Sequence, residues 1–267
     1  MNRINLKVPI LVYHEIVNDG DMARLSNVLQ KKYIVEKGVF DKQLQYLSDN
    51  NYECLNISEI PVFKESSKRK IACITFDDGY AGNFTLALPV LKKYSFKATF
   101  FIVTKWIGKV HMMTWEQIKT LVDEGMEIGS HTNSHRLLET CDTEIIQNEL
   151  VESKENIKKH LGYNTQVVSY PNGSYTLLVN EIAKNTGYSA VLTSDFGYAD
   201  SKNHSFSLKR IFITNNIASL VNTMKAGPWF LFTSYCKEYF KKSARLIIGR
   251  GRYDRIYNKL FNINIPT

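Results

Sequence analysis

The chain has 267 residues, of which 44% are hydrophobic, and its net charge is +8. This length fits one α/β barrel domain, and the hydrophobic content can bury a large core. No apolar run approaches the ~20 residues of a membrane-crossing helix. The apolar stretch 8–13 is too short for the hydrophobic region of a signal peptide, so we expect no Sec export. The four cysteines are widely spaced, which favours reduced, buried thiols in a cytoplasmic protein.

Apolar runs typical of strands alternate with helical patterns along most of the chain. The predicted strands cover residues 7–14, 71–76, 97–103, 126–129, 166–169, 188–193 and 208–213. Predicted helices lie around 40–50, 86–94, 114–124, 142–161 and 177–184, and the polar segment 18–32 is predicted to be a loop. Thr114 and Gln117 form a capping box at the start of one helix. The alternation predicts a parallel sheet, closed or nearly closed into a barrel, with function at the carboxyl ends of its strands.

Polar side chains collect where the predicted strands end. Asp77 and Asp78 follow the strand 71–76, His131 follows the strand 126–129, and His14 ends the strand 7–14. Adjacent carboxylates repel each other, so a buried pair requires a cation. Two imidazoles and a carboxylate are a common ligand set for a divalent metal with an open position. The pattern predicts a metal hydrolase.

The two carboxylates can serve one site only if the strand breaks between them, because adjacent strand residues point to opposite faces. Gly79 permits that break. One carboxylate can then bind the metal while the other takes a proton from the metal's water. The alternative is that one of the two caps a helix beginning near residue 81.

A second polar segment contains two histidines. His131 and His135 are spaced like neighbours on one helical face, and a pair at this spacing is more typical of ligands than of structural residues. Ser130 and Thr132 are predicted to donate or accept hydrogen bonds that orient the imidazoles.

The two segments, TFDDGY at 75–80 and SHTNSH at 130–135, resemble the first two motifs of the polysaccharide deacetylase family, also called carbohydrate esterase family four or the NodB homology domain. The resemblance covers residues 71–213 approximately. It implies a distorted (β/α) barrel that removes acetyl groups from N-acetylated sugars with a divalent metal, commonly zinc, with cobalt or nickel as alternatives. It also implies that Asp77 is the general base and that Asp78, His131 and His135 bind the metal.

Residues 169–173, SYPNG, resemble the family's third motif, R-x-P-x-G, although they also read as an ordinary turn after a strand. The resemblance implies that the main-chain N–H of Asn172 stabilises the oxyanion and that Tyr170 forms part of the sugar-facing wall. Pro171 and Tyr80 are also assigned to substrate binding.

Ser169 stands where the third motif usually has an arginine. The departure removes the arginine that the family places beside the general base. Arg210 ends the region of resemblance, and we expect it to pair with an active-site carboxylate instead.

The general acid also departs from the common pattern. Many family members use a late histidine, but after residue 173 this chain has only His204, in a polar loop. Residues 9–16, PILVYHEI, resemble the opening segment of a subgroup that acts on poly-N-acetylglucosamine, in which an early histidine fills this role. The resemblance therefore assigns the general acid to His14. The alternative is a core histidine bonded to a neighbouring carbonyl.

The positive charge is concentrated near the C-terminus, where residues 237–260 contain eight Lys or Arg and only two acidic residues. Aromatic side chains recur there at helical spacing, which suits either a helix lying on an anionic membrane or helices that cover the barrel. We assign residues 1–215 to the catalytic domain and residues 216–267 to a helical basic extension. No recognition motif suggests a nucleic-acid partner.

These observations favour a metal-dependent carbohydrate N-deacetylase. Its expected substrate is an N-acetylated amino sugar in a polysaccharide or lipid-linked glycan, such as a cell-surface precursor made at the inner face of the cytoplasmic membrane. The alternatives are an acetyl-ester hydrolase or small-sugar deacetylase on the same fold, and a non-catalytic glycan-binding module. A non-catalytic module is expected to have lost a ligand or the base, whereas this chain retains all four residues.

Overall fold

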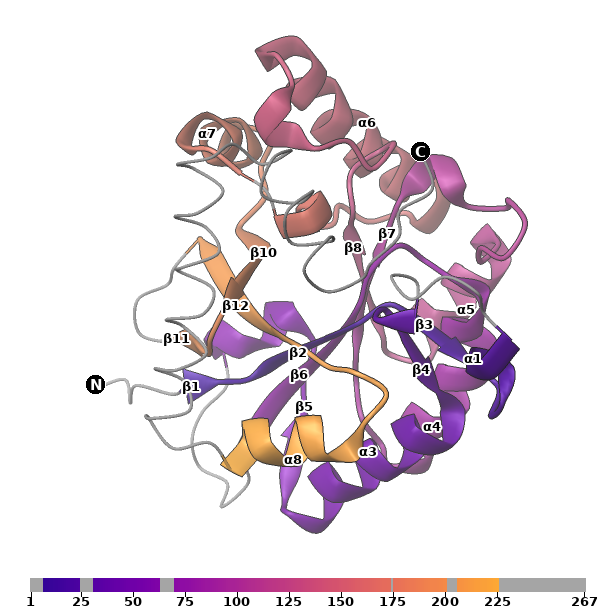
Figure 1. Cartoon of the computed structure of the whole chain (residues 1–267). Coiled ribbons are helices and arrows are strands. Elements are labelled where there is room, and N and C mark those ends of the chain that lie inside the picture. The colour runs from indigo at the N-terminus through magenta and orange to yellow at the C-terminus, as the bar shows by residue number, and fades with distance from the viewer. Residues whose placement is uncertain (1–6, 25–30, 63–69, 174, 201–205, 226–267) are drawn as a thin grey trace, which may run out of the picture.

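The computed structural model describes residues 7–24, 31–62, 70–173, 175–200 and 206–225. Seven parallel strands of this part close into a barrel (Figure 1), in the order β2, β12, β10, β9, β8, β7 and β6, with β6 pairing back to β2. They are β2 (Ile10–Tyr13), β6 (Lys70–Phe76), β7 (Thr99–Ile102), β8 (Glu127–Ser130), β9 (Val167–Ser169), β10 (Ala190–Phe196) and β12 (Ser207–Phe212). The predicted distorted (β/α) barrel is confirmed.

Helices surround the barrel (Figure 1), and five of them lie where the sequence predicted helices. They are α1 (Asp21–Arg24), α3 (Lys37–Asp49), α4 (Leu88–Lys93), α5 (Trp115–Asp123), α6 (Thr143–Leu161), α7 (Leu177–Asn185) and α8 (Ile217–Lys225). Thr114 and Gln117 exchange the two hydrogen bonds of the predicted capping box at the start of α5. The helix α6 begins after Asp142, whose carboxylate accepts from the N–H of Ile145, and ends at Gly162 with φ 79°.

Several short strands escape the sequence patterns. Pro9 divides the predicted first strand because it has no N–H to donate. The resulting β1 (Lys7–Val8) pairs with β11 (Ala199–Asp200) rather than with the barrel. The strands β3 (Glu15–Val17) and β4 (Ile34–Glu36) pair with each other, and β5 (Tyr52–Cys54) pairs with the start of β6. The predicted loop 18–32 contains the short helix α1 in its described part.

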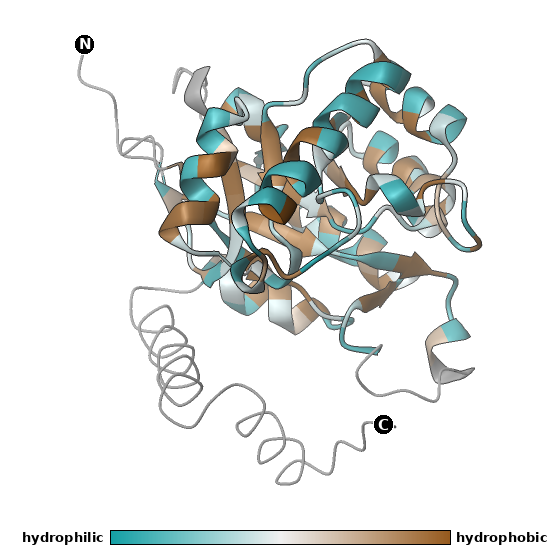
Figure 2. Ribbon diagram, turned by 90° about the horizontal axis from the view of Figure 1, so that it is seen from above, coloured by the Kyte–Doolittle hydropathy of each residue, from teal (hydrophilic) through white to brown (hydrophobic). Residues whose placement is uncertain are grey.

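The core fills the barrel and the space between strands and helices. Phe76 and Phe100 are fully buried and stacked with their ring centroids 4.8 Å apart. Figure 2 shows hydrophobic strands inside and hydrophilic outer helix faces, as expected when apolar surface is removed from water. Cys54 and Cys73 are buried free thiols.

The helix α8 packs on this core through the fully buried Leu220. Most of the predicted basic extension, residues 226–267, lies outside the described residues, and so do its proposed membrane contact and Cys236. No helix of the described part is both long and apolar enough to cross a bilayer.

Candidate functional site

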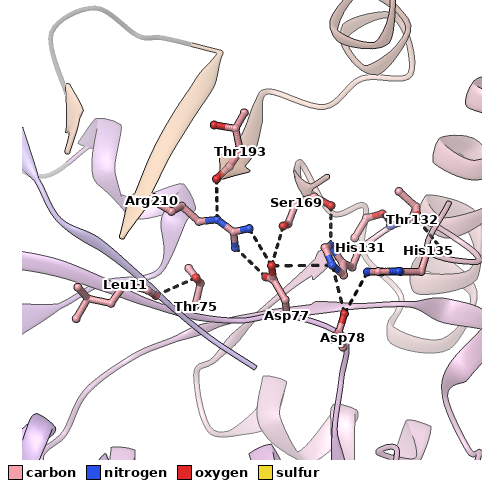
Figure 3. Close-up of polar contacts among 11 residues, drawn as sticks. Leu11, Thr75, Asp77, Asp78, His131, Thr132, His135, Ser169, Thr193 and Arg210 are labelled. Carbon is pink, nitrogen blue, oxygen red and sulfur yellow. Dashed lines mark hydrogen bonds and ion pairs between the residues drawn. The ribbon is translucent and has the colours of Figure 1, made fainter. Parts of the chain in front are cut away.

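The end of β6 turns sharply and presents both carboxylates on one side. Asp77 still pairs with the barrel, since its N–H donates to the carbonyl of Tyr13 at 3.0 Å. The strand then breaks at Asp78, with φ 75°, and Gly79, with φ 92°. Aspartate tolerates this left-handed conformation better than most residues. Figure 3 shows the two side chains next to each other at the strand end. The predicted break is present, and it starts one residue before the glycine.

The two histidines converge on Asp78 from the end of β8. The Nε2 atoms of His131 and His135 each lie 3.4 Å from Asp78 Oδ1. One ligand atom from each of the three residues can be chosen so that all lie within 4.8 Å of one another. The helical spacing suggested by the sequence is not the cause, because residues 131–135 form a loop with positive φ at Thr132 and His135.

The orientation of His131 is set by a main-chain carbonyl. Its Nδ1 lies 2.7 Å from the carbonyl oxygen of Ser169. A carbonyl only accepts hydrogen bonds, so Nδ1 carries a proton, and the ring turns its Nε2 toward Asp78.

The expectation that Ser130 and Thr132 orient the imidazoles is corrected by their hydrogen bonds. Ser130 Oγ accepts from the N–H of Thr132, and Thr132 Oγ1 accepts from the N–H of His135, both at 3.1 Å. These short side chains lie next to main-chain donors of their own loop and therefore support its backbone rather than the rings.

Asp77 forms a buried ion pair across the barrel. Arg210, from β12, donates Nη1 to Oδ1 and Nη2 to Oδ2, both at 2.8 Å, and its Nε donates to the carbonyl of Thr193. Ser169 Oγ adds a hydrogen bond to Asp77 Oδ2 at 3.2 Å. Asp77 is 2% exposed and Arg210 is 4% exposed. The partner that the sequence suggested for Arg210 is thus Asp77 (Figure 3).

The charges of the site shift the pKa values of its side chains. Burial opposes ionisation of Asp77, but Arg210 and His131 outweigh it and hold the pKa of this carboxyl well below its usual range. For His131, burial is outweighed by Asp77 and Asp78, which raise its pKa. Burial and the neighbouring His131 lower the pKa of His135 to about 4. His135 is therefore the member of the cluster most easily kept neutral, as a ligand must be.

Known proteins resemble this chain over most of its length. A sequence profile described as polysaccharide deacetylase matches residues 64–191. The Bacillus subtilis protein YxkH, named as a candidate polysaccharide deacetylase, is 35% identical over 211 residues, which cover 78% of this chain and 72% of that protein. The chain belongs to the polysaccharide deacetylase family.

Two further relatives of this chain have informative names. A Streptococcus pyogenes deacetylase solved in complex with acetate is 32% identical, with a TM-score of 0.74, covering 83% of this chain and all of that one. A Staphylococcus aureus poly-β-1,6-N-acetyl-D-glucosamine N-deacetylase is 26% identical over 160 residues, covering 54% of this chain and 55% of that enzyme. The chain therefore spans about half of the staphylococcal enzyme.

The third motif of this chain lies at the end of β9, but two of its substrate assignments are wrong. Ser169 faces the site, so the next side chain points to the opposite side of the strand. Tyr170 is accordingly fully buried and donates its hydroxyl to Asn180 Oδ1 at 3.1 Å. Pro171 is buried too, so neither side chain can form a sugar-facing wall.

Asn172 is exposed and has φ 53°, in the tight turn that follows β9. Gly173 completes this turn, and a Cβ there would lie 2.0 Å from the backbone nitrogen of Ser194. The turn therefore packs against β10 in a way that only glycine allows. The role of the Asn172 N–H as an oxyanion donor stays a prediction.

His14 and Tyr80 lie at the same end of the barrel. The ring centroid of His14 is 4.8 Å from that of Tyr33, and its buried Nδ1 has no hydrogen-bond partner in the described part of the chain. Burial lowers the pKa of His14, against the opposing effect of Asp77 and Asp78. Tyr80 is partly buried, and burial and Asp78 raise the pKa of its hydroxyl. The catalytic role of His14 and the substrate contact of Tyr80 stay predictions.

Sequence reasoning missed two neighbours of the cluster. The Trp106 ring centroid lies 5.0 Å from that of His135, and Ser169 contacts both Asp77 and His131. The position of Ser169 at a predicted strand end was a usable signal for its contacts. Trp106 had no such signal, because its loop reaches His135 only through the packing of β7 beside β8.

The Asp77–Arg210 pair yields a prediction for stability. Arg210→Met removes the guanidinium, keeps much of the side-chain volume and leaves a buried carboxylate unpaired. We expect the free energy of unfolding to fall by about 3–5 kcal/mol near pH 7 in urea denaturation with chelator present. Lys92→Met is the control, because it breaks the exposed pair with Glu124 and should change little.

The pH dependence tests the assignment to Asp77. The Asp77 carboxyl has a lower pKa in the folded protein than in the unfolded chain. Its ionised form therefore stabilises the fold above about pH 4, and this stabilisation is lost as the pH falls through the folded pKa. In the Arg210→Met variant the guanidinium no longer offsets the effect of burial on the pKa of Asp77. The stabilisation by the ionised carboxylate is then lost. The stability gap between the two proteins should therefore narrow as the pH falls below about 4. A gap that stays constant would contradict the assignment.

Proposed function

We propose that this protein is a metal-dependent hydrolase that removes N-acetyl groups from an amino sugar in a polysaccharide or lipid-linked glycan. One observation carries the proposal: a buried carboxylate paired with an arginine lies beside a cluster of one carboxylate and two imidazoles. The first is suited to proton transfer and the second to metal binding. Both lie at the carboxyl ends of barrel strands, where catalytic residues of such barrels gather.

The cluster of Asp78, His131 and His135 fits a divalent metal. Asp78 Oδ1 is buried and accepts no hydrogen bond in the described structure, although it lies between two imidazole nitrogens. A buried acceptor without a donor is costly, and a cation would satisfy it. Two nitrogen ligands and one oxygen ligand suit zinc, and also cobalt or nickel.

When bound, such a metal would polarise the acetamide carbonyl and lower the pKa of the attacking water. We assign the proton of that water to Asp77, and the 3.9 Å distance between its Oδ2 and His131 Nε2 supports this assignment. Arg210 keeps Asp77 in the ionised form that a base requires, although a low pKa also makes it a weaker base. We assign the oxyanion to the exposed Asn172 turn, where a main-chain N–H can donate.

His14 is our proposed general acid. The leaving amine of an amide must be protonated, and His14 lies close enough to Asp77 and Asp78 for their charges to influence its pKa. Because burial lowers that pKa, its protonated form is a stronger acid than an exposed imidazolium. The His14 ring packs against the ring of Tyr33 in an edge-on contact and against the ring of Phe212 in a tilted contact.

The named relatives support the choice of substrate. The staphylococcal relative is named for N-deacetylation of a poly-N-acetylglucosamine, and the streptococcal structure contains acetate, the acid that deacetylation releases. We therefore propose a β-linked N-acetylglucosamine chain or its lipid-linked precursor as the substrate class.

Acetate release from N-acetylglucosamine oligomers tests the proposed reaction. We expect zinc-loaded protein to release acetate and chelator to abolish it. Asp77→Asn should lower kcat/KM by about 10²-fold or more, because the amide cannot accept the proton. Asp41→Asn, a surface change on α3, should keep full activity. Chelator-insensitive release, or none with zinc, cobalt or nickel, would overturn the proposal.

His14→Ala separates the general acid from a structural histidine. Loss of the acid should lower kcat on the N-acetyl substrate by about 10²-fold or more. Hydrolysis of 4-nitrophenyl acetate should fall much less, because its phenolate leaves without a proton. A uniform loss on both substrates would indicate damage to the site, and full turnover of the amide would exclude the assignment.

A further inference from the structure

The loop that carries both histidines has a strained backbone. Thr132 and His135 both have positive φ, at 65° and 66°. Such values are disfavoured for residues with a Cβ, and most of all for a β-branched residue such as threonine. A strained conformation persists only where surrounding contacts impose it. Hydrogen bonds within the loop supply part of that constraint, through Ser130 and Thr132.

Further constraint comes from α6. Glu149 Oε2 accepts from the main-chain N–H of Asn133 at 3.0 Å and from that of Ser134 at 2.7 Å. Its Oε1 accepts from Ser134 Oγ. One carboxylate thus takes three hydrogen bonds from two consecutive residues, which lie directly between the two histidines. One helical turn further, Ser153 Oγ lies 2.7 Å from Ser130 Oγ at the start of the same loop.

The position of Glu149 is unusual for a carboxylate. It is only 6% exposed and lies on the buried face of α6 with Ile146 and Leu150. A buried carboxylate is costly unless it is fully hydrogen-bonded, and here the donors come mainly from the loop. Arg136 Nε lies 3.9 Å from Glu149 Oε1, but this arginine is largely exposed and therefore stabilises the buried carboxylate only slightly. Packing of α6 against the core would not by itself require a carboxylate at position 149.

We propose that Glu149 is a positioning residue for the metal site. Its carboxylate holds the loop 131–135 in the strained form that directs both imidazoles at Asp78, and so sets the affinity for the metal. This inference rests on the proposed function, because it assumes that Asp78, His131 and His135 bind a divalent cation. Glu149 touches neither the metal nor the substrate and acts only through the loop.

Zinc binding by the full-length protein tests this role without any activity assay. The probe is zinc alone, in competition with a chromophoric chelator, and the thermal unfolding of the metal-free protein is measured beside it. Glu149→Ala should weaken zinc binding by about 10-fold to 100-fold, the usual loss when a partner of a ligand is removed. The absorption spectrum of bound cobalt should change as well, because the ligand geometry relaxes.

Glu127→Ala is the matched control. Glu127 starts β8, the strand that ends at His131, and its carboxylate also accepts from a hydroxyl, Thr99 Oγ1, and a main-chain N–H, that of Ser58. It lies at the opposite end of the strand from the site. The Glu127→Ala variant should have a lower melting temperature, but its zinc affinity and the absorption spectrum of its bound cobalt should be unchanged.

The outcomes distinguish a failure of the proposed metal site from a failure of the positioning role of Glu149. If the unmodified protein binds no zinc, the proposed function fails, and this inference fails with it. If it binds zinc and Glu149→Ala binds equally well, only the positioning role is overturned. Equal weakening in the Glu127 control would likewise overturn it, since a general loss of stability would then explain both results.

A second variant keeps the test valid if Glu149→Ala does not fold. Ser134→Ala removes one of the three donors at a partly exposed position and leaves the helix intact. It should weaken zinc binding by about fivefold, the worth of one hydrogen bond. Unchanged zinc affinity in this variant would contradict the proposal.

Discussion

The paired hydrogen bonds between Arg210 and Asp77 are the interaction on which the rest of the site depends. They join the last barrel strand, β12, to the end of β6, which lies two strands away around the closed barrel. Two charges removed from water are stable only when their geometry satisfies both, as this pair does. The pair holds Asp77 ionised and fixed, while the next residue, Asp78, faces the two histidines.

The arginine that pairs with Asp77, the proposed general base, comes from a different strand than in the common family pattern. Ser169 occupies the usual arginine position on β9 and still contributes, through its hydroxyl to Asp77 and its carbonyl to His131. One residue therefore contacts both Asp77 and His131, a member of the proposed metal cluster. A guanidinium reaching Asp77 from β12 gives the same charge at the same carboxylate, so the change of strand preserves the electrostatics of the site.

Much of this arrangement could be predicted from the sequence because it depends on local patterns. Strand ends and their polar residues identified Asp78, His131 and His135, and a local capping box placed the start of α5. The two-residue and three-residue strands β3, β4, β5 and β11 were missed, because they are too short to show a period.

Other features could not be predicted because they depend on distant parts of the chain. Whether Tyr170 faces sugar or core was decided by the pleat of β9, since Ser169 takes the side that faces the site. The strained loop conformation that replaces the expected helical spacing is hydrogen-bonded to Glu149 from α6, and nothing local to the histidines indicates this contact. Residue types at strand ends thus predicted which residues meet, but not the backbone geometry that brings them together.

The most direct test of the account is to locate the metal. Crystals grown with zinc should give one strong anomalous peak at the zinc edge, at roughly 2.0–2.2 Å from Asp78 and from Nε2 of His131 and His135. Asp77 should remain paired with Arg210 and outside bonding distance of that peak. A peak bound by Asp77 in place of Asp78, or no peak at this cluster in zinc-saturated crystals, would contradict the division of roles between the two carboxylates.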